Sequence, residues 1–271
     1  MTILITGAAG LVGMRLLPRL MAAGMECRAL LRPGKIAPQG VTAVEGDLLD
    51  ASSLETAVQG VSAIIHLAAV FRSRDTEMIW KSNLDGTRNL IAAVKAQSPG
   101  ARFIMASTLH VYGPEGSRPG REDDETNPKL AYPASKVEAE KALRASGLNW
   151  SIQRFGFVYG DKDGHLEALP GLASSAKMHP AKRMSMIHHR DIAIAMKLAL
   201  DGAMDGRVVN LTDDAPTSIF ELAELVGEAM EPSSEPLANP WHLQASGALA
   251  RQLESPRVSW RPFRLSQAAT A

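Results

Sequence analysis

The stretch Thr6-Gly7-Ala8-Ala9-Gly10-Leu11-Val12-Gly13 decides the fold of this chain, because its glycines are spaced G-x-x-G-x-x-G directly after an apolar run at residues 2–6. In such a turn the first glycine permits a tight bend, the second lets a pyrophosphate approach the backbone, and the third lets helix and strand pack closely. The helix that follows would offer free N–H groups and a partial positive charge to an anion. Because the motif lies between a predicted strand and a predicted helix, it favours dinucleotide binding over an unliganded turn.

Apolar strands and helical segments alternate from this turn outward. The predicted strands are Thr2–Thr6, Glu26–Leu31, Val41–Glu45, Ala63–Leu67, Arg102–Ala106 and Trp150–Phe155. The predicted helices are Leu11–Ala23, Ala51–Gln59, Thr76–Ala96 and Tyr132–Ser146. Strands that are apolar throughout and joined by helices indicate a parallel sheet covered on both faces. With right-handed crossovers, the pattern predicts an α/β fold with a Rossmann-type doubly wound parallel sheet.

The later part of the chain is sparser in regular elements. We expect a strand at Met184–Ile187, a helix at Arg190–Leu200, a strand at Val208–Leu211, a helix at Ser218–Met230 and a proline-rich linker at 231–240. We therefore expect residues 1–160 and 186–212 to form the dinucleotide-binding domain. Residues 161–185 and 213–271 would form a small C-terminal substrate-binding cap, with a frayed end at 264–271.

Composition excludes several classes of protein. The 271 residues contain 29 Lys plus Arg and 29 Asp plus Glu, and this balance argues against a protein that coats nucleic acid. Cys27 is the single cysteine, which excludes an internal disulfide and a cysteine-based metal cluster. The apolar stretch at 63–71 is too short to cross a membrane, and no basic segment precedes the first apolar run as it would in a secretory signal. We expect a cytoplasmic protein that binds neither nucleic acid nor membrane.

The end of the second predicted strand bears on the choice of cofactor. An acidic residue there would bind the free ribose 2′-hydroxyl of NAD, whereas a basic residue would accept the 2′-phosphate of NADP. The segment Cys27–Lys35 contains no acid, and Arg32 occupies the expected position. The forked donors of a guanidinium suit a phosphate, so the sequence favours NADP(H), with NAD(H) as the alternative.

Tyr132-Pro133-Ala134-Ser135-Lys136 places a tyrosine and a lysine four residues apart, on one face of a predicted helix. A nearby ammonium group stabilises a phenolate, so we expect Lys136 to lower the pKa of Tyr132. Tyr132 could then exchange a proton with a substrate hydroxyl or carbonyl. The spacing alone also arises by chance on surface helices.

The glycine turn, the Tyr/Lys pair and the hydroxyl segment Ser107-Thr108 occur in the order typical of one family. Together they resemble the extended short-chain dehydrogenase/reductase family, also called NAD-dependent epimerases/dehydratases, over residues 2–230. Further matches are Gly46-Asp47-Leu48, His66-Leu67-Ala68-Ala69, Asn83-Leu84-Asp85-Gly86-Thr87, Val111-Tyr112-Gly113, Arg154-Phe155-Gly156-Phe157-Val158-Tyr159-Gly160 and His189-Arg190-Asp191-Ile192-Ala193.

The resemblance implies a role for individual residues. Thr108 would donate a hydrogen bond to the reacting oxygen, with Ser107 as the alternative; Tyr132 would exchange the proton, and Lys136 would hold the nicotinamide ribose. Hydride would move between the cofactor and a substrate carbon. The residues implied to bind the cofactor are Gly7, Gly10, Leu11, Val12, Gly13, Arg32, Asp47, Leu48, Leu67, Ala68, Ala69, Asn83, Ser107, Tyr132, Lys136 and Phe155.

Four histidines raise the question of a metal. His66, His110, His188 and His189 do not follow the spacing of a zinc motif, so we interpret them as structural or substrate-facing and predict no metal site.

Two departures from the sugar-nucleotide members of the family bear on the substrate. Those enzymes place an Asn where this chain has Phe157, and only about 25 residues separate Gly160 from the predicted strand at Met184. These features favour a reductase of a small or apolar ketone. The alternatives are a nucleotide-sugar epimerase or dehydratase and, from another class, a non-catalytic NADP-binding sensor or scaffold.

The resemblance also implies a homodimer. Its interface would be formed by the predicted helices Thr76–Ala96 and Tyr132–Ser146 of two subunits. The first of these helices carries an apolar band that could serve both the sheet and a partner, consisting of Ile79, Trp80, Asn83, Leu84, Thr87, Leu90, Ile91 and Val94.

Overall fold

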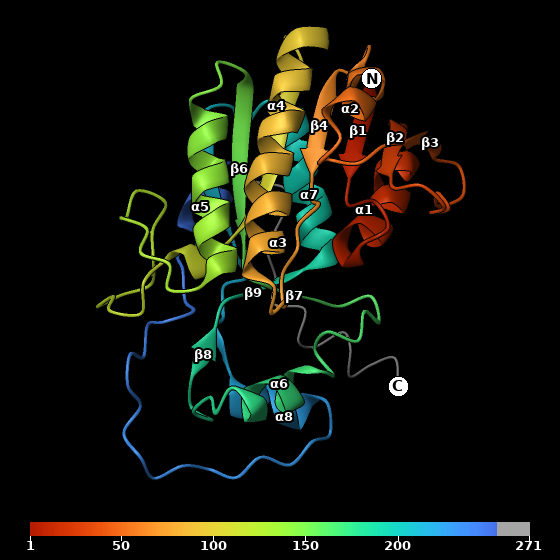
Figure 1. Cartoon of the computed structure of the whole chain (residues 1–271). Coiled ribbons are helices and arrows are strands. Elements are labelled where there is room, and N and C mark those ends of the chain that lie inside the picture. The colour runs from red at the N-terminus through yellow and green to blue at the C-terminus, as the bar shows by residue number, and fades with distance from the viewer. Residues whose placement is uncertain (254–271) are drawn as a thin grey trace.

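The computed structural model describes residues 1–253, and a seven-stranded parallel sheet lies at its centre (Figure 1). The strand order is β10-β6-β5-β4-β1-β2-β3, so the direction of winding reverses between β1 and β4. The strands are β1 (Thr2–Thr6), β2 (Glu26–Leu31), β3 (Thr42–Glu45), β4 (Ala63–His66), β5 (Arg102–Thr108), β6 (Asn149–Phe155) and β10 (Arg207–Leu211). This arrangement confirms the predicted Rossmann-type fold. In open α/β sheets of this kind a ligand binds in a crevice outside the carboxyl ends of the strands where the winding reverses, which here are β1 and β4.

Helices cover both faces of the sheet. One face packs against α1 (Leu11–Ala22), α7 (His189–Leu200) and α9 (Ala248–Leu253), and the other against α2 (Ala51–Val58), α4 (Gly86–Gln97) and α5 (Ala131–Arg144). Successive residues of β1 enter opposite cores: Ile3 and Ile5 pack on the α1 side, and Leu4 packs on the α2 side. This alternation follows from the geometry of a strand and explains why β1 is apolar at every position.

The predicted single helix at Thr76–Ala96 is wrong in one respect. The segment divides into α3 (Thr76–Trp80), a π-helical turn at Lys81–Asp85, and α4. Asn83 lies in the π turn, where its backbone oxygen accepts a hydrogen bond from the Thr87 hydroxyl at 2.6 Å. Side-chain bonds of this kind compete with the regular helical ladder, and π turns are frequent at functional sites.

A smaller assembly lies beside the carboxyl edge of the sheet (Figure 1). It contains β7 (Phe157–Tyr159) paired with β9 (Met186–His188), and β8 (Arg183–Met184) paired with β11 (Thr217–Ser218). The helices α6 (Leu169–Ser175) and α8 (Ile219–Leu225) pack on each other here. They share a separate core of Tyr159, Leu166, Leu169, Ala173, Met184, Met186, Ile219 and Leu222.

Several predicted boundaries in this region are wrong. The strand expected at Met184–Ile187 is two strands in different sheets, because the Ser185 N–H donates to the Leu243 carbonyl between them. The helix expected at Ser218–Met230 ends at Leu225, and Gly227 follows with φ of 77°. The sequence did not indicate β7, β11, α6 or α9. Within residues 1–253 the structure contains no helix long and apolar enough to span a membrane. The expected frayed end at 264–271 lies outside the described residues.

Candidate active site

The glycine turn has the backbone geometry that a pyrophosphate site requires. Gly7 has φ of +70°, and a Cβ built on it would lie 2.7 Å from the Ala68 nitrogen. A Cβ on Gly13 would lie 2.3 Å from the Gly7 oxygen, so α1 can approach β1 only because this residue is glycine. Helix α1 begins after Gly10 without a side-chain cap and without an acidic residue in its first turn. Its N-terminal N–H groups and positive dipole end are therefore suited to an anion.

Other predicted cofactor residues lie at the carboxyl ends of neighbouring strands. Leu67, Ala68 and Ala69 follow β4, and Asp47 and Leu48 follow β3. The Asp47 carboxylate accepts from the Leu49 N–H at 2.9 Å, and the Asp47 N–H donates to the Ser53 hydroxyl at 3.0 Å, which fixes this turn.

Arg32 and Phe155 also lie at the carboxyl ends of strands, on the same edge of the sheet. Arg32 comes directly after β2 and is exposed, and Phe155 is the buried last residue of β6. The structure thus brings the predicted cofactor residues to one edge of the sheet.

His66 joins the ends of β1 and β4 inside the protein. Its Nδ1 lies 2.7 Å from the Thr6 hydroxyl, and its Nε2 lies 2.9 Å from the Thr87 hydroxyl. Burial, with a smaller effect of the Lys136 charge, lowers the pKa of His66 to about 3. His66 is therefore a neutral structural residue that aligns the crevice, in keeping with its interpretation from the sequence.

Asn83 fixes the loop after β4 against the start of α5. Its carboxamide exchanges two hydrogen bonds with the Val70 backbone, at 2.8 and 2.9 Å, and donates to the Ser135 hydroxyl at 3.0 Å. Ser135 in turn donates to the Tyr132 carbonyl at 2.7 Å. Asn83 is fully buried, so its side chain acts on the site by holding these segments in place.

Thr108 is the last residue of β5, and Tyr132 and Lys136 lie in the first turns of α5, which packs against β5. The Thr108 hydroxyl lies close enough to the Tyr132 phenol to lower the pKa of that phenol. Burial raises the pKa of Tyr132 to about 12, and the contact with Thr108 offsets only part of this rise. The expectation that Lys136 lowers the pKa of Tyr132 is therefore wrong for this arrangement, because desolvation of the phenolate dominates.

Lys136 lies one helical turn after Tyr132 and is buried. Burial lowers its pKa to about 8, and the charge of Glu140 opposes this effect. A lysine with a pKa near neutrality changes its charge within the working range of most enzymes, which is typical of functional sites.

Ser107 is engaged elsewhere. Its hydroxyl donates to Glu140 at 2.5 Å, and Glu140 also accepts two hydrogen bonds from Arg154, at 3.1 and 2.7 Å. The Arg154 guanidinium continues to the Tyr112 hydroxyl at 2.9 Å. The sequence did not indicate this buried chain, although Glu140 follows Lys136 by one helical turn. Because Glu140 holds the Ser107 hydroxyl, Thr108 is the hydroxyl available to Tyr132.

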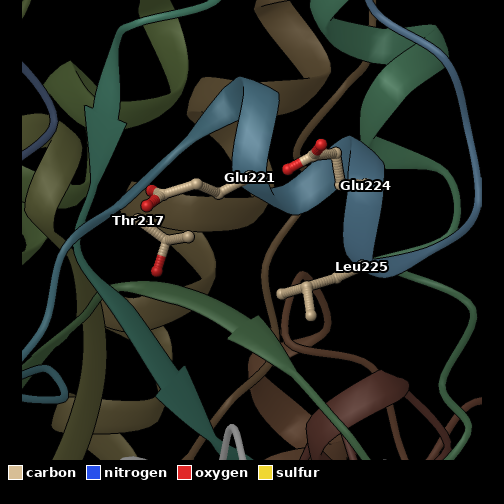
Figure 2. Close-up of a pocket in the computed structure, with 4 residues that line it drawn as sticks. All are labelled: Thr217, Glu221, Glu224 and Leu225. Carbon is tan, nitrogen blue, oxygen red and sulfur yellow. The ribbon is translucent and has the colours of Figure 1, made fainter.

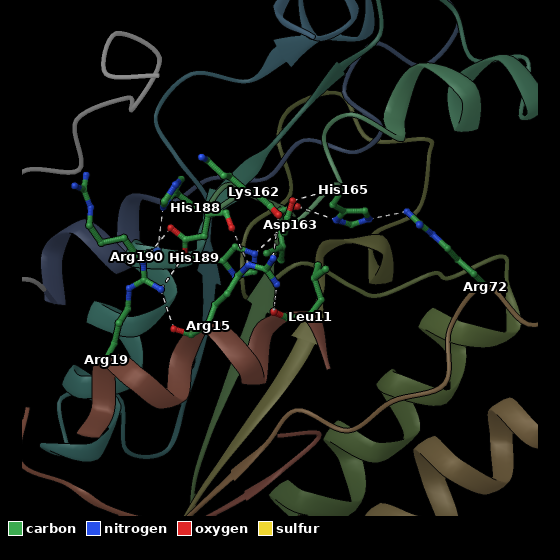
Figure 3. A network of polar contacts seen from close by, with 12 residues as sticks. Leu11, Arg15, Arg19, Arg72, Lys162, Asp163, His165, His188, His189 and Arg190 are labelled. Atoms are coloured by element: carbon green, nitrogen blue, oxygen red, sulfur yellow. Dashed lines mark hydrogen bonds and ion pairs between the residues drawn. The ribbon is translucent and has the colours of Figure 1, made fainter. Parts of the chain in front are cut away.

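The loop after β7 is attached to α1 and α7 by charged side chains (Figure 3). Arg15 donates to the carbonyls of Asp161 and Lys162, at 3.3 and 3.2 Å, and Arg19 pairs with the Asp161 carboxylate at 2.8 Å. His189, at the start of α7, lies 2.7 Å from the buried Asp163 carboxylate. The loop therefore lies beside the helix that begins at the glycine turn, a connection that sequence spacing did not reveal.

A separate pocket of about 270 Å³ lies on α8 (Figure 2). It is lined by Thr217, Glu221, Glu224 and Leu225. Glu221 also forms a capping box with Ser218 at the start of α8, so its carboxylate has a structural role. None of the predicted catalytic or cofactor residues lines this pocket.

The histidines show no metal-binding arrangement in the described part of the chain. Among residues 1–253, no group of three or more His, Cys, Asp or Glu side chains could hold a metal ion. The side chain of His188 instead caps α7 by accepting from the Arg190 N–H at 3.0 Å.

Comparisons with known proteins agree with this geometry. Residues 3–212 match the model of the NAD dependent epimerase/dehydratase family. The chain is 33% identical over 197 residues to ceramide reductase of Caulobacter vibrioides. The aligned region covers 70% of this chain and 57% of that protein. It thus spans little more than half the length of that relative.

A second relative and a solved structure match over more of their length. The chain is 28% identical to 4-hydroxy-2-methyl-3-oxo-4-farnesyl-3,4-dihydroquinoline-1-oxide ketoreductase of Stigmatella aurantiaca, over 93% of this chain and 79% of that protein. The crystal structure of a short-chain dehydrogenase/reductase superfamily protein from Agrobacterium tumefaciens with bound NAD is 26% identical. Its TM-score is 0.80, and the match covers 100% of this chain and 96% of that one.

Proposed function

The chain belongs to the NAD-dependent epimerase/dehydratase family, and from this we propose that it is an oxidoreductase that reduces a small or apolar ketone. The observation that carries the proposal is the placement of three residues: Thr108 ends β5, and α5, which packs against β5, carries Tyr132 and the buried Lys136 one helical turn apart. Two hydroxyl donors at one point suit a carbonyl oxygen that becomes an alkoxide, because one can stabilise the charge while the other supplies the proton. Both curated relatives are reductases by name, which supports this direction of reaction.

The crevice at the glycine turn fits a nicotinamide dinucleotide. Gly7, Gly10 and Gly13 leave room for a pyrophosphate at the start of α1, and the cofactor supplies hydride when bound. Lys136 would hold the nicotinamide ribose. The further contacts that we propose come from Leu11, Val12, Asp47, Leu48, Leu67, Ala68, Ala69, Ser107 and Phe155, with Asn83 positioning the loop after β4.

We infer a preference for NADP(H) from Arg32. It follows β2 directly and is exposed, and the segment Cys27–Lys35 contains no acid that would repel a 2′-phosphate. A guanidinium binds phosphate through two parallel hydrogen bonds. The structural neighbour named above has NAD bound. The proposed preference of this chain for NADP(H) therefore rests on Arg32 alone.

A substrate screen tests the proposed reaction. NADPH and NADH oxidation would be followed by absorbance with a panel of apolar ketones and with UDP-glucose, and products would be identified by mass. We expect net reduction of a ketone by the wild type and its loss in Tyr132→Phe. Conversion of UDP-glucose to an isomer without net cofactor oxidation would instead indicate an epimerase. Cofactor binding without turnover of any compound would indicate a sensor.

We also propose a homodimer formed by α3, α4 and α5. These helices lie side by side on one face of the sheet (Figure 1). Most of the apolar band predicted for the contact is buried within the chain itself, including Leu90 and Val94. The interface would therefore use the outward side of α4, where Ala92 and Ala96 are exposed and small enough for another helix to approach closely.

A further inference from the structure

Basic and imidazole side chains contact one another near Tyr132, beginning with Arg72, which packs on the Phe71 ring next to the Tyr132 ring. We propose that this group binds an anionic substituent of the substrate, a carboxylate or a phosphate. The inference rests on the proposed function, because it concerns the same site, and it narrows the substrate to a carbonyl compound that carries a negative charge. The group, called here the basic cluster, consists of Arg72, His110, His165, Lys182 and His242.

Arg72 connects the basic cluster to Tyr132. The ring centroids of Phe71 and Tyr132 are 5.6 Å apart, and the Arg72 guanidinium carbon lies 4.8 Å from the centroid of the Phe71 ring. The Arg72 backbone has φ of 58°, a conformation that costs energy in a residue other than glycine and is found mostly at functional sites. Arg72 is thus held one aromatic ring away from the proposed proton donor.

The partner of Arg72 in the structure is a neutral imidazole (Figure 3). The Arg72 Nη2 lies 2.7 Å from the His165 Nε2, and the His165 Nδ1 lies 2.8 Å from the Val158 carbonyl. Because a guanidinium only donates, Nε2 accepts and Nδ1 carries the proton. Burial, followed by a smaller effect of the Arg72 charge, lowers the pKa of His165. The contact therefore leaves the charge of Arg72 uncompensated.

His110 extends the basic cluster toward Thr108. Its backbone N–H donates to the Thr108 hydroxyl at 3.2 Å, which places it in the turn that follows β5. The protein around its ring, and then the charge of Arg72, lower the pKa of His110. His110 lies two residues after Thr108, in the turn that Thr108 caps.

Lys182 and His242 complete the basic cluster from the smaller assembly. The Lys182 Nζ lies 3.1 Å from the His242 Nδ1. Burial lowers the pKa of His242 to about 4, with further lowering by the charges of Lys182 and His110. Like Arg72, Lys182 has a neutral imidazole as its polar contact.

The acids nearest the basic cluster already have partners. Glu115 faces His242 but pairs with Lys129 at 3.5 Å, and Asp163 pairs with His189 at 2.7 Å. In residues 1–253 neither Arg72 nor Lys182 forms an ion pair with a carboxylate. Charge-assisted hydrogen bonds to an external carboxylate or phosphate would supply the missing countercharge.

Aromatic rings beside the cluster favour an anion attached to an apolar body. Phe157 stacks on His165 with centroids 4.3 Å apart, and Phe71 lies under Arg72. Phe157, the first residue of β7, and Phe71, in the loop after β4, thus flank the Arg72–His165 contact. A charged group at Arg72 and an apolar group between the rings would fit one ligand.

Binding of small aromatic probes tests the proposal without requiring turnover. Benzoate, phenyl phosphate and the neutral benzyl alcohol would be titrated into protein saturated with its nicotinamide cofactor, which keeps phosphate away from the glycine turn. Calorimetry would give affinities, and the histidine C–H resonances would report the location. We expect both anions to bind more tightly than benzyl alcohol and to shift the His110 and His165 resonances. The anion that binds more tightly identifies the carboxylate or the phosphate as the natural group.

Matched substitutions distinguish a specific role of Arg72 from a general effect of positive charge on anion binding. Arg72→Gln should weaken anion binding by about tenfold or more, whereas Arg74→Gln, at a nearby exposed arginine, should leave it within about twofold. Arg72→Lys should retain part of the affinity, and thermal melting would show that each variant folds. Equal binding of benzyl alcohol and the anions, or equal losses in the two Gln variants, would overturn the proposal. Anion binding without ketone reduction would contradict the proposed function and leave the anion site intact.

Discussion

At the scale of single residues, the proposed reaction depends on a proton held by Tyr132. Because burial keeps its pKa near 12, the phenol is protonated at neutral pH and can act as a general acid. Tyr132→Phe removes this proton and keeps the ring. We expect turnover to fall by about 10²–10⁴-fold, the usual contribution of proton transfer, with an unchanged dissociation constant for the cofactor. Steady-state kinetics and cofactor titration would measure both, and a variant with wild-type turnover would remove Tyr132 from the proposed mechanism.

The proposed role of Lys136 predicts a pH dependence for the reaction. Its pKa is lowered to about 8 by burial, so the side chain is an ammonium below pH 8 and loses its charge as the pH rises through this value. If the ammonium holds the ribose and supports Tyr132, kcat/KM for ketone reduction should be level below pH 8 and fall above it. Lys136→Met should be slow throughout and should lack this limb. A wild-type profile that stays level to pH 10 would argue against a role for the charge.

The proposed preference for NADP(H) depends on Arg32. A charge-assisted hydrogen bond contributes roughly 1.5–3 kcal/mol, which corresponds to a preference for NADPH of about tenfold or more. Arg32→Ala should therefore weaken NADPH much more than NADH. Equal losses would mean that the guanidinium stacks on the adenine without reading the phosphate. Dissociation constants of both cofactors for both proteins would distinguish these cases.

At the scale of elements, a buried ion pair joins α5 to β6. Arg154 and Glu140 are almost completely buried and lie 2.7 Å apart. Glu140→Gln leaves the guanidinium without a countercharge, and we expect a loss of about 3–5 kcal/mol in the free energy of unfolding. Glu138→Gln on the same helix breaks an exposed pair with Lys141 and should cost less than about 1 kcal/mol. Urea unfolding of the two variants would test this, and similar costs would contradict the assigned role.

The sequence predicted the elements whose signal is local. The first strand and α1 were found because an apolar run, three glycines and a helical pattern occur within about twenty residues, and the parallel sheet followed from the repetition of this pattern. The π turn at Lys81–Asp85 was missed because the pattern of apolar residues does not show it: the Thr87 hydroxyl bonds to the Asn83 carbonyl, and the Asn83 side chain bonds to Val70 and Ser135, which are distant in the chain. The short strands β7 and β11 pair with partners more than twenty residues away and carry little periodicity of their own.

The same limit applies to the candidate site. The spacing of Tyr132 and Lys136 is readable because one helix carries both residues. The preference for Thr108 over Ser107 is supported by a contact that only the fold reveals, the hydrogen bond from Ser107 to Glu140. The proximity of Arg72 to His165, which are 93 residues apart, depends likewise on the meeting of two loops at the crevice.

At the scale of the whole molecule, the smaller assembly is joined to the sheet domain both by packing and by charge, because Val158 of β7 and Ile187 of β9 belong to the apolar core that α1 and α7 cover. The smaller assembly has its own apolar core. It meets α1 through Arg15 and Arg19, which bind the loop after β7. Because the same loop carries His165, a ligand at the basic cluster would lie against residues that also contact the cofactor helix.

The last prediction concerns the assembly of two chains. If the outward side of α4 forms the dimer interface, a charge in its middle should disrupt association without harming the fold. Ala92 is exposed in the single chain, so Ala92→Glu should leave the thermal melting curve of the monomer almost unchanged. In the dimer the same carboxylate would be desolvated, and it would meet its symmetry-related copy if Ala92 lies near the two-fold axis. We expect sedimentation velocity at micromolar concentration to show a dimer for the wild type and a monomer for Ala92→Glu.

The matched control Ala22→Glu, on the exposed side of α1, should remain dimeric. A monomeric wild type would refute the proposed dimer, and dimers in all three proteins would place the interface on another face of the molecule.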